Sequence, residues 1–163
     1  MAKLKIYLDT SVVSFYFADD TPEKQDVTIE FFEKFLDKYD VSISRLAIAE
    51  LENTADDELR NKMLDIIENF NINILDVEKE NEREIFDLAN LYVNEKVIPR
   101  SKFNDAVHIA ICTYFGFDIL LSWNFRHLSN IRKQMLVNSV NIKAGFNKDL
   151  FLLSPLEVIY EKT

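Results

Sequence analysis

Four polar residues, widely separated in the chain, each stand where a short apolar run begins or ends. Asp9 and Asn124 each follow such a run, Glu50 closes one, and Asp105 opens one. Strand and helix ends come together at one edge of the sheet in α/β proteins, so we expect these side chains to meet there. Three carboxylates and one amide would suit a hard divalent cation. The set therefore indicates metal-assisted chemistry on phosphate.

The segments that must position these residues alternate between strand and helix patterns. The predicted strands are 4–8, 41–43, 72–75, 118–122 and 150–153; the predicted helices are 12–17, 22–39, 44–50, 56–69, 78–95, 103–115 and 127–144, with another start at 154–157. Such alternation favours a parallel sheet with helices on both faces, a three-layer α/β/α fold of four to five strands. Without a linker or a repeat, residues 1–163 are expected to form a single domain.

Composition narrows the class of protein. The 163 residues are 48% hydrophobic and 29% charged with only 2 Gly, which favours a compact, helix-rich domain. No apolar run reaches the length of a membrane span, and the first residues lack a signal-peptide core, so we expect a cytoplasmic location. Cys112 is the only cysteine, which excludes an internal disulfide and a multi-cysteine zinc site.

The charge is distributed unevenly. The formal net charge is −9, yet residues 96–148 carry eight Lys and Arg against two Asp and Glu. Attraction to phosphate decays over about 8–10 Å at ordinary salt, so this basic segment can hold a polyanion locally. Alternatively, these side chains only solvate helix faces. The acidic remainder argues against a sequence-indifferent binder of long duplex DNA.

Each carboxylate also has a simpler interpretation. Asp9 could be a helix cap, and Asp105 a first-turn acid favoured by the helix dipole. Haloacid-dehalogenase-type phosphatases also place an aspartate after their first strand, but their second aspartate is replaced here by Ser11. Glu50 continues an apolar stripe, whereas Glu52 points about 200° away, so Glu50 is expected to face inward.

Two further side chains lie near the predicted site. His108 follows Asp105 by one helical turn and could act as a general base. A packed supporting role is favoured, because cations that prefer oxygen ligands rarely recruit imidazole. Arg126 follows Asn124 closely and could pair with a phosphate.

Four segments taken in order, 8–11, 49–51, 102–108 and 121–124, resemble the PIN-domain (PilT N-terminus) ribonucleases. That family includes the VapC-like toxins of type II toxin–antitoxin pairs. The resemblance implies a parallel sheet between helices and Mg²⁺- or Mn²⁺-dependent cleavage of single-stranded RNA. It also implies a homodimer and an antitoxin protein as a partner. Asp9, Glu50 and Asp105 correspond to the metal-binding carboxylates.

The departure from the family pattern is Asn124, which stands where a fourth acid is usual. Asp118 lies at the opposite end of the same predicted strand and cannot replace it. We therefore expect a site for one cation, with Thr10 and Asn124 orienting metal-bound water and Lys102 and Arg126 holding the RNA backbone. The expected function is a metal-dependent endoribonuclease. The alternative is a catalytically weak PIN-like module that binds RNA or protein through an eroded site.

Overall fold

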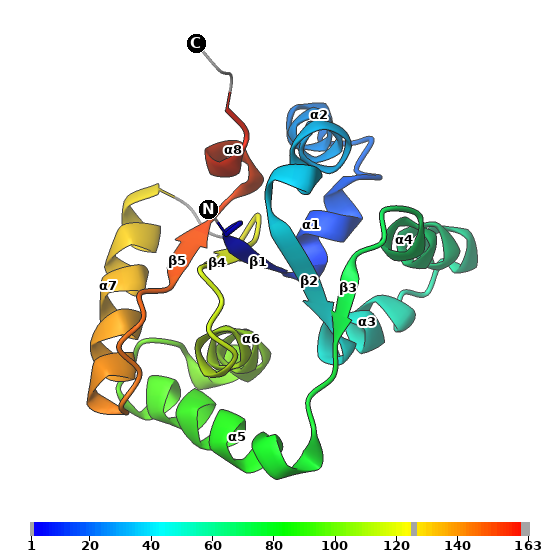
Figure 1. Cartoon of the computed structure of the whole chain (residues 1–163). Helices are drawn as coiled ribbons and strands as arrows, with labels where there is room; N and C mark the ends of the chain where they lie inside the picture. The colour runs from blue at the N-terminus through cyan, green and yellow to red at the C-terminus, as the bar shows by residue number, and fades with distance from the viewer. Residues whose placement is uncertain (1, 125–126, 161–163) are drawn as a thin grey trace.

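The computed structural model of the chain describes residues 2–124 and 127–160, without the side chains of 127–130. Within these residues, five parallel strands form one sheet in the order β3-β2-β1-β4-β5 (Figure 1). The strands are β1 Lys5–Leu8, β2 Asp40–Ser44, β3 Asn73–Leu75, β4 Ile119–Leu121 and β5 Phe151–Leu153. The predicted parallel sheet is confirmed, and each strand lies within about one residue of its predicted bounds.

Helices connect successive strands. They are α1 Thr10–Phe15, α2 Pro22–Glu30, α3 Arg45–Glu52, α4 Asp57–Asn69, α5 Lys79–Asn94, α6 Phe103–Tyr114, α7 His127–Lys143 and α8 Pro155–Val158. Asp9 is the N-cap of α1, so this helix begins earlier than the predicted 12–17. The predicted helix 22–39 changes geometry after α2, continuing as a π-helical turn, Phe31–Phe35, and a 3₁₀ turn, Leu36–Lys38.

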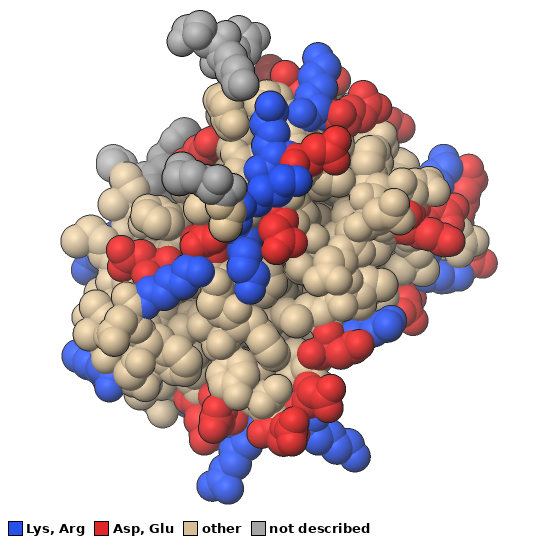
Figure 2. Space-filling model, viewed as in Figure 1, with Lys and Arg blue, Asp and Glu red and all other residues tan. Residues whose placement is uncertain are grey.

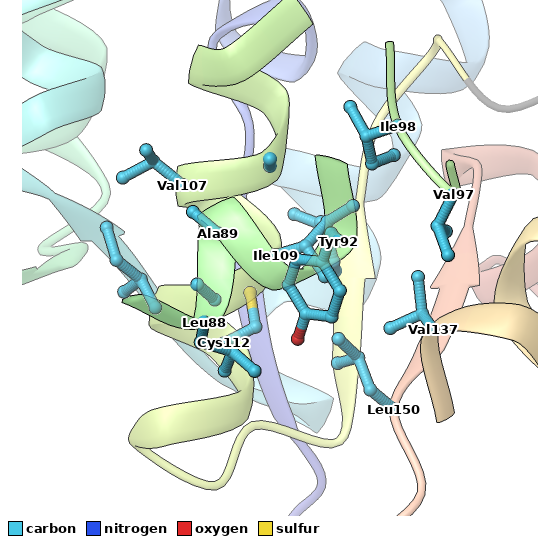
Figure 3. Packing of buried hydrophobic residues seen from close by; sticks show 14 of the residues in the cluster. Leu88, Ala89, Tyr92, Val97, Ile98, Val107, Ile109, Cys112, Val137 and Leu150 are labelled. Atoms are coloured by element: carbon cyan, nitrogen blue, oxygen red, sulfur yellow. The ribbon is translucent and has the colours of Figure 1, made fainter. Parts of the chain in front are cut away.

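The sheet separates two buried clusters. Helices α5, α6 and α7 cover one face, and α1 to α4 cover the other (Figure 1). Figure 3 shows the first cluster, in which Tyr92 of α5 packs with Ile109 of α6 and Val137 of α7. Cys112 is fully buried in the same cluster, as a core residue. The three-layer α/β/α architecture is therefore confirmed.

The side of the sheet on which the chain adds strands changes at β1. From β1 the chain adds β2 on one side, and later returns to add β4 on the other. Leu8 pairs with Leu121 in the register, and the Asp9 amide donates to the Leu121 carbonyl at 3.0 Å. The carboxyl ends of β1 and β4 are therefore adjacent, which is where open α/β sheets bind ligands. Strand β4, predicted to be central, is an interior strand beside the middle strand β1.

The surface carries both signs of charge. On the face seen in Figure 2, acidic side chains gather at the lower edge over α5 with Lys or Arg side chains beside them, and further Lys and Arg side chains form a band from the upper edge to the middle. Among the described residues, no helix is long and apolar enough to cross a membrane.

Candidate functional site

Asp9 lies at the carboxyl ends of β1 and β4, where several hydrogen bonds hold its carboxylate. It is only 8% exposed. Its Oδ1 accepts the Thr10 amide at 2.7 Å and the Thr10 hydroxyl at 3.2 Å. Its Oδ2 accepts the hydroxyls of Ser122 at 2.6 Å and Ser11 at 3.1 Å, and the Asn124 Nδ2 at 3.3 Å. These donors fix the carboxylate in one orientation.

Two serines that were not predicted as site residues, Ser11 and Ser122, hold the turn after β4 next to α1. The Ser11 hydroxyl oxygen accepts the Trp123 amide at 3.0 Å, and the Ser122 hydroxyl oxygen accepts the Asn124 amide at 3.0 Å. The Trp123 indole donates to the Thr28 hydroxyl at 2.9 Å, which buries the ring against α2. The turn that carries Asn124 is thus held by three separate contacts.

Glu50 enters the site from α3, which follows β2. Its side chain is 29% exposed, and its Oε1 accepts the His108 Nε2 at 2.9 Å. One ligand atom each from Asp9, Glu50 and His108 lie within 4.8 Å of one another. Glu52 is exposed to solvent. The predicted inward orientation of Glu50 is therefore confirmed.

Helix α6 contributes Asp105 at its first turn and His108 one turn later. Crowding by protein atoms, and then the charge of Asp9, raise the pKa of the Asp105 carboxyl above its ordinary value. His108 is only 3% exposed. Burial lowers its pKa, but the Glu50 hydrogen bond and the charges of Asp9, Glu50 and Asp105 outweigh burial, so the pKa of His108 is raised. The negative charge of Asp9 contributes to both shifts.

A cavity of about 540 Å³ opens beside these carboxylates. It is lined by Asp9, Asp105, His108 and Asn124, by the lysines Lys24, Lys102 and Lys133, and by the aromatic rings of Phe15 and Trp123, among others. The Lys24 ammonium lies 5.3 Å from the centre of the Phe15 ring and 5.5 Å from that of Trp123. The cavity therefore combines an acidic floor with cationic and aromatic walls.

The donor set fits a divalent cation. None of the ion pairs between described residues includes Asp9 or Asp105, and Glu50 pairs only with His108. Carboxylates that converge without Lys or Arg neutralising them are stabilised by a bound cation. Oxygen donors of this kind are those that Mg²⁺ and Mn²⁺ prefer.

The structure brings most of the predicted site residues together. Asp9 and Glu50 lie close, Asp105, Asn124 and Lys102 line the same cavity as Asp9, and Thr10 donates to Asp9. Arg126 lies outside the described residues. Ser11, Ser122, Lys24 and Lys133 were not predicted as site residues, because only tertiary packing brings their side chains to Asp9 or to the cavity. Asp118 lies at the opposite edge of the sheet, as expected, where it accepts the Lys5 amide at 2.8 Å.

Comparison with known proteins gives a family and a fold. The PIN domain family matches residues 6–133. No curated protein matches the chain. A similar solved structure is the VapBC2 complex of Rickettsia felis bound to a DNA fragment from their promoter; it shows 15% sequence identity and a TM-score of 0.60, over 93% of this chain and 98% of that chain. That similarity concerns the fold. The family match covers most of the chain, and the protein therefore belongs to the PIN domain family.

Proposed function

We propose that the protein is a Mg²⁺- or Mn²⁺-dependent endoribonuclease that cleaves single-stranded RNA. The observation that carries the proposal is that Asp9 lies close to Glu50 and lines one cavity with Asp105. Among the described residues, none of these three carboxylates forms an ion pair with Lys or Arg. PIN domains are generally nucleases that use divalent metal ions, which agrees with this donor set.

Asp9, Glu50 and Asp105 would hold the cation. A bound Mg²⁺ or Mn²⁺ would polarise the scissile phosphate and lower the pKa of the attacking water. Thr10 and Asn124 hold the Asp9 carboxylate by hydrogen bonds and would orient water next to it. The Asp9 carboxylate thus needs no reorganisation when substrate arrives.

The lysines around the cavity would hold the RNA backbone. Lys24, Lys102 and Lys133 line its wall, and their ammonium groups are suited to phosphate oxygens. Arg126 is proposed to add to them. A flexible single strand can bring one phosphate to the acidic floor while neighbouring phosphates contact the lysines, whereas the acidic remainder of the chain disfavours a long duplex.

Asn124 supports a working site with one cation. Its amide nitrogen donates to Asp9 Oδ2, a contact that an ionised aspartate could not make, because two carboxylates would repel each other. Asn124 is therefore proposed to hold the Asp9 carboxylate in place instead of binding a second metal. Replacing Asn124 by Asp is expected to weaken the hold on Asp9 without raising cleavage; a large gain in cleavage would favour the alternative of a site crippled by the amide.

The test is cleavage of a panel of single-stranded RNAs in Mn²⁺ and in EDTA. Cleavage is expected in Mn²⁺ only, and Asp9→Asn should abolish it. Asp118→Asn is the matched control, since it changes a carboxylate at the opposite edge of the sheet and its amide oxygen can still accept from Lys5. Cleavage in EDTA, or an active Asp9→Asn protein, would exclude the mechanism. A folded protein that binds RNA yet takes up no Mn²⁺ would favour the catalytically weak module.

We also propose an antitoxin partner and a homodimer, as in a type II toxin–antitoxin pair. The structural neighbour is a VapBC2 complex, which supports a partner of this kind. Expression of the chain alone is expected to stop bacterial growth, and co-expression with the product of the adjacent gene should restore it. Unchanged growth in both cases would contradict the toxin role while leaving the nuclease activity open to its own test.

A further inference from the structure

A continuous chain of buried hydrogen bonds runs from the end of β2 to the Glu50 carboxylate. The Ser44 hydroxyl lies 2.7 Å from the Tyr7 hydroxyl, which lies 2.6 Å from Nδ1 of His108. Nε2 of the same imidazole lies 2.9 Å from Glu50 Oε1. Tyr7 and Ser44 are fully buried and His108 nearly so. The chain therefore links β1, β2 and α6 to a side chain of α3.

Counting donors gives this chain a direction. The Ser44 oxygen accepts the Ala47 amide at 3.1 Å, and the Tyr7 oxygen is the acceptor within reach of the Ser44 proton. Tyr7 then donates to Nδ1 of His108, and Nε2 carries the proton that goes to Glu50. With neutral imidazole, this arrangement gives each buried hydroxyl and ring nitrogen a partner.

Protonated imidazole leaves the last link unchanged. In that state Nδ1 donates to the Tyr7 oxygen and Tyr7 donates to Ser44, while Nε2 still donates to Glu50. The one arrangement that fails is the neutral tautomer with its proton on Nδ1, because a lone pair on Nε2 would then face the Glu50 carboxylate. Nε2 is therefore a donor both in this neutral state and in the protonated one, and in neither does it have a lone pair to offer a cation.

The hydrogen bond from His108 restricts the conformation of the Glu50 side chain. Its side chain has three rotatable bonds and is partly exposed, and His108 is its only recorded side-chain partner among the described residues. An unrestrained glutamate loses rotamer freedom when it binds a cation, which weakens binding. A hydrogen bond to one carboxylate oxygen removes that freedom in advance and leaves the other oxygen available.

We propose that Tyr7 and His108 are positioning residues for Glu50: Tyr7 fixes the His108 imidazole, which holds Glu50 Oε1 and leaves Oε2 for the divalent cation. The inference rests on the proposed function, because it takes Glu50 as a ligand of the cation. It removes His108 from the set of ligands although its ring nitrogen lies close to the Asp9 and Glu50 oxygens.

The test is a Mn²⁺ titration of the full chain, followed by calorimetry or by the electron paramagnetic resonance signal of free Mn²⁺. Tyr7→Phe should weaken Mn²⁺ binding about 10-fold or more, the usual effect of removing a group that orients a metal ligand. Tyr92→Phe is the matched control: Tyr92 is also fully buried and belongs to the same core cluster (Figure 3), but its hydroxyl contacts Asn141 and Thr113 instead of His108. Its Mn²⁺ affinity should match the wild type.

A second pair of variants separates the hydrogen bond from the fold. The amide of His108→Gln can still donate to Glu50, so this protein should bind Mn²⁺ about 10-fold more tightly than His108→Leu. In the His108→Leu background, Tyr7→Phe should cause no further loss, because Tyr7 acts only through the imidazole.

Each outcome decides one question. Wild-type affinity in Tyr7→Phe, equal affinity of His108→Gln and His108→Leu, or a further loss in the double variant would overturn the positioning roles. If His108→Gln loses Mn²⁺ affinity as completely as Asp9→Asn does, then His108 is itself a ligand of the cation. If the wild type binds no Mn²⁺ at millimolar concentration, the proposed function fails instead.

Discussion

Among the described residues, four donate five hydrogen bonds to Asp9, more than any other carboxylate at the site receives. Within the same described part of the chain, Glu50 receives one hydrogen bond, and the Asp105 carboxylate receives none, so Asp105 is placed by its position on α6. The three carboxylates therefore differ in how strongly the protein prepares them. Asp9 is fixed in place, Glu50 is oriented through a buried imidazole, and Asp105 is free to adjust when a cation binds.

The charged Asp105 carboxylate is expected to destabilise the folded protein when no cation is bound. Its pKa is raised in the folded protein, so the folded state binds its proton more tightly than the unfolded state. The stabilising contribution is present below the ordinary pKa of aspartate and is lost as the pH rises through the raised pKa. At pH 7 in EDTA, Asp105→Asn should therefore melt at a higher temperature than the wild type.

Scanning calorimetry at several pH values checks this. The difference in melting temperature should shrink as the pH falls below the ordinary pKa of aspartate, and Mn²⁺ should stabilise the wild type more than the variant. A lower melting temperature for Asp105→Asn than for the wild type at pH 7 in EDTA would show that the charged Asp105 carboxylate does not destabilise the folded protein.

Not all residues of the site could be predicted from the sequence. Asp9, Glu50, Asp105 and Asn124 stand at element ends, and strand order in an α/β sheet then brings them to one edge. Ser11, Ser122, Lys24 and Lys133 belong to the site only because of tertiary packing. No local pattern marks a serine that accepts an amide from a turn more than a hundred residues away.

At the scale of elements, some helix-capping residues only stabilise a helix, whereas others also contact the site. Ser44 caps α3 by accepting the Ala47 amide and is also the first link of the buried chain to Glu50. Asp56 caps α4 by accepting the Leu59 amide and has no contact with the site in the described structure. The two residues form a natural pair for separating helix stability from site geometry.

Ser44→Ala and Asp56→Ala are each expected to lower the free energy of unfolding by about 1 kcal/mol, the typical loss for a removed cap. Only Ser44→Ala should also weaken Mn²⁺ binding. Urea denaturation and Mn²⁺ titration of both variants provide the comparison. Equal Mn²⁺ affinities in the two proteins would mean that the link from Ser44 to Glu50 has no effect on the site.

The elements themselves followed closely from hydrophobic periodicity. The segment 22–39 is the exception, because its apolar positions fit a single helical face imperfectly. Inside α2 the buried residue is the polar Thr28, whose hydroxyl accepts the Trp123 indole and donates to the Lys24 carbonyl. A buried polar side chain with a distant partner cannot be read from an apolar pattern. The Phe-rich run that follows then adopts a π-helical turn.

At the scale of the whole molecule, a chain of net charge −9 presents three lysines around one cavity. Lys102 and Lys133 come from the basic segment 96–148, but Lys24 comes from the acidic first part of the chain. The fold thus assembles a local positive wall that the overall charge conceals. Local charge governs contact with phosphate, since screening limits the influence of the distant acidic surface.

The three lysines around the cavity predict how RNA binding depends on the salt concentration. Three neutralised phosphates on a single strand give a slope of about −2 for the logarithm of affinity against the logarithm of salt concentration. Fluorescence polarisation with the cleavage-deficient Asp9→Asn protein measures it. Lys133→Ala should reduce the slope by about 0.7, whereas Lys148→Ala, at the Asp118 edge, should leave it unchanged. Equal slopes for all three proteins would place the RNA elsewhere.

The most direct test of a single cation held by Asp9, Glu50 and Asp105 is the rate of single-stranded RNA cleavage as a function of free Mn²⁺ concentration. The rate is expected to be zero in EDTA and to rise with Mn²⁺ along a simple one-site curve. Asp9→Asn should stay inactive at all concentrations, and Asp118→Asn should follow the wild type. A rate that is independent of Mn²⁺, or an Asp9→Asn curve that matches the wild type, would contradict the proposed chemistry.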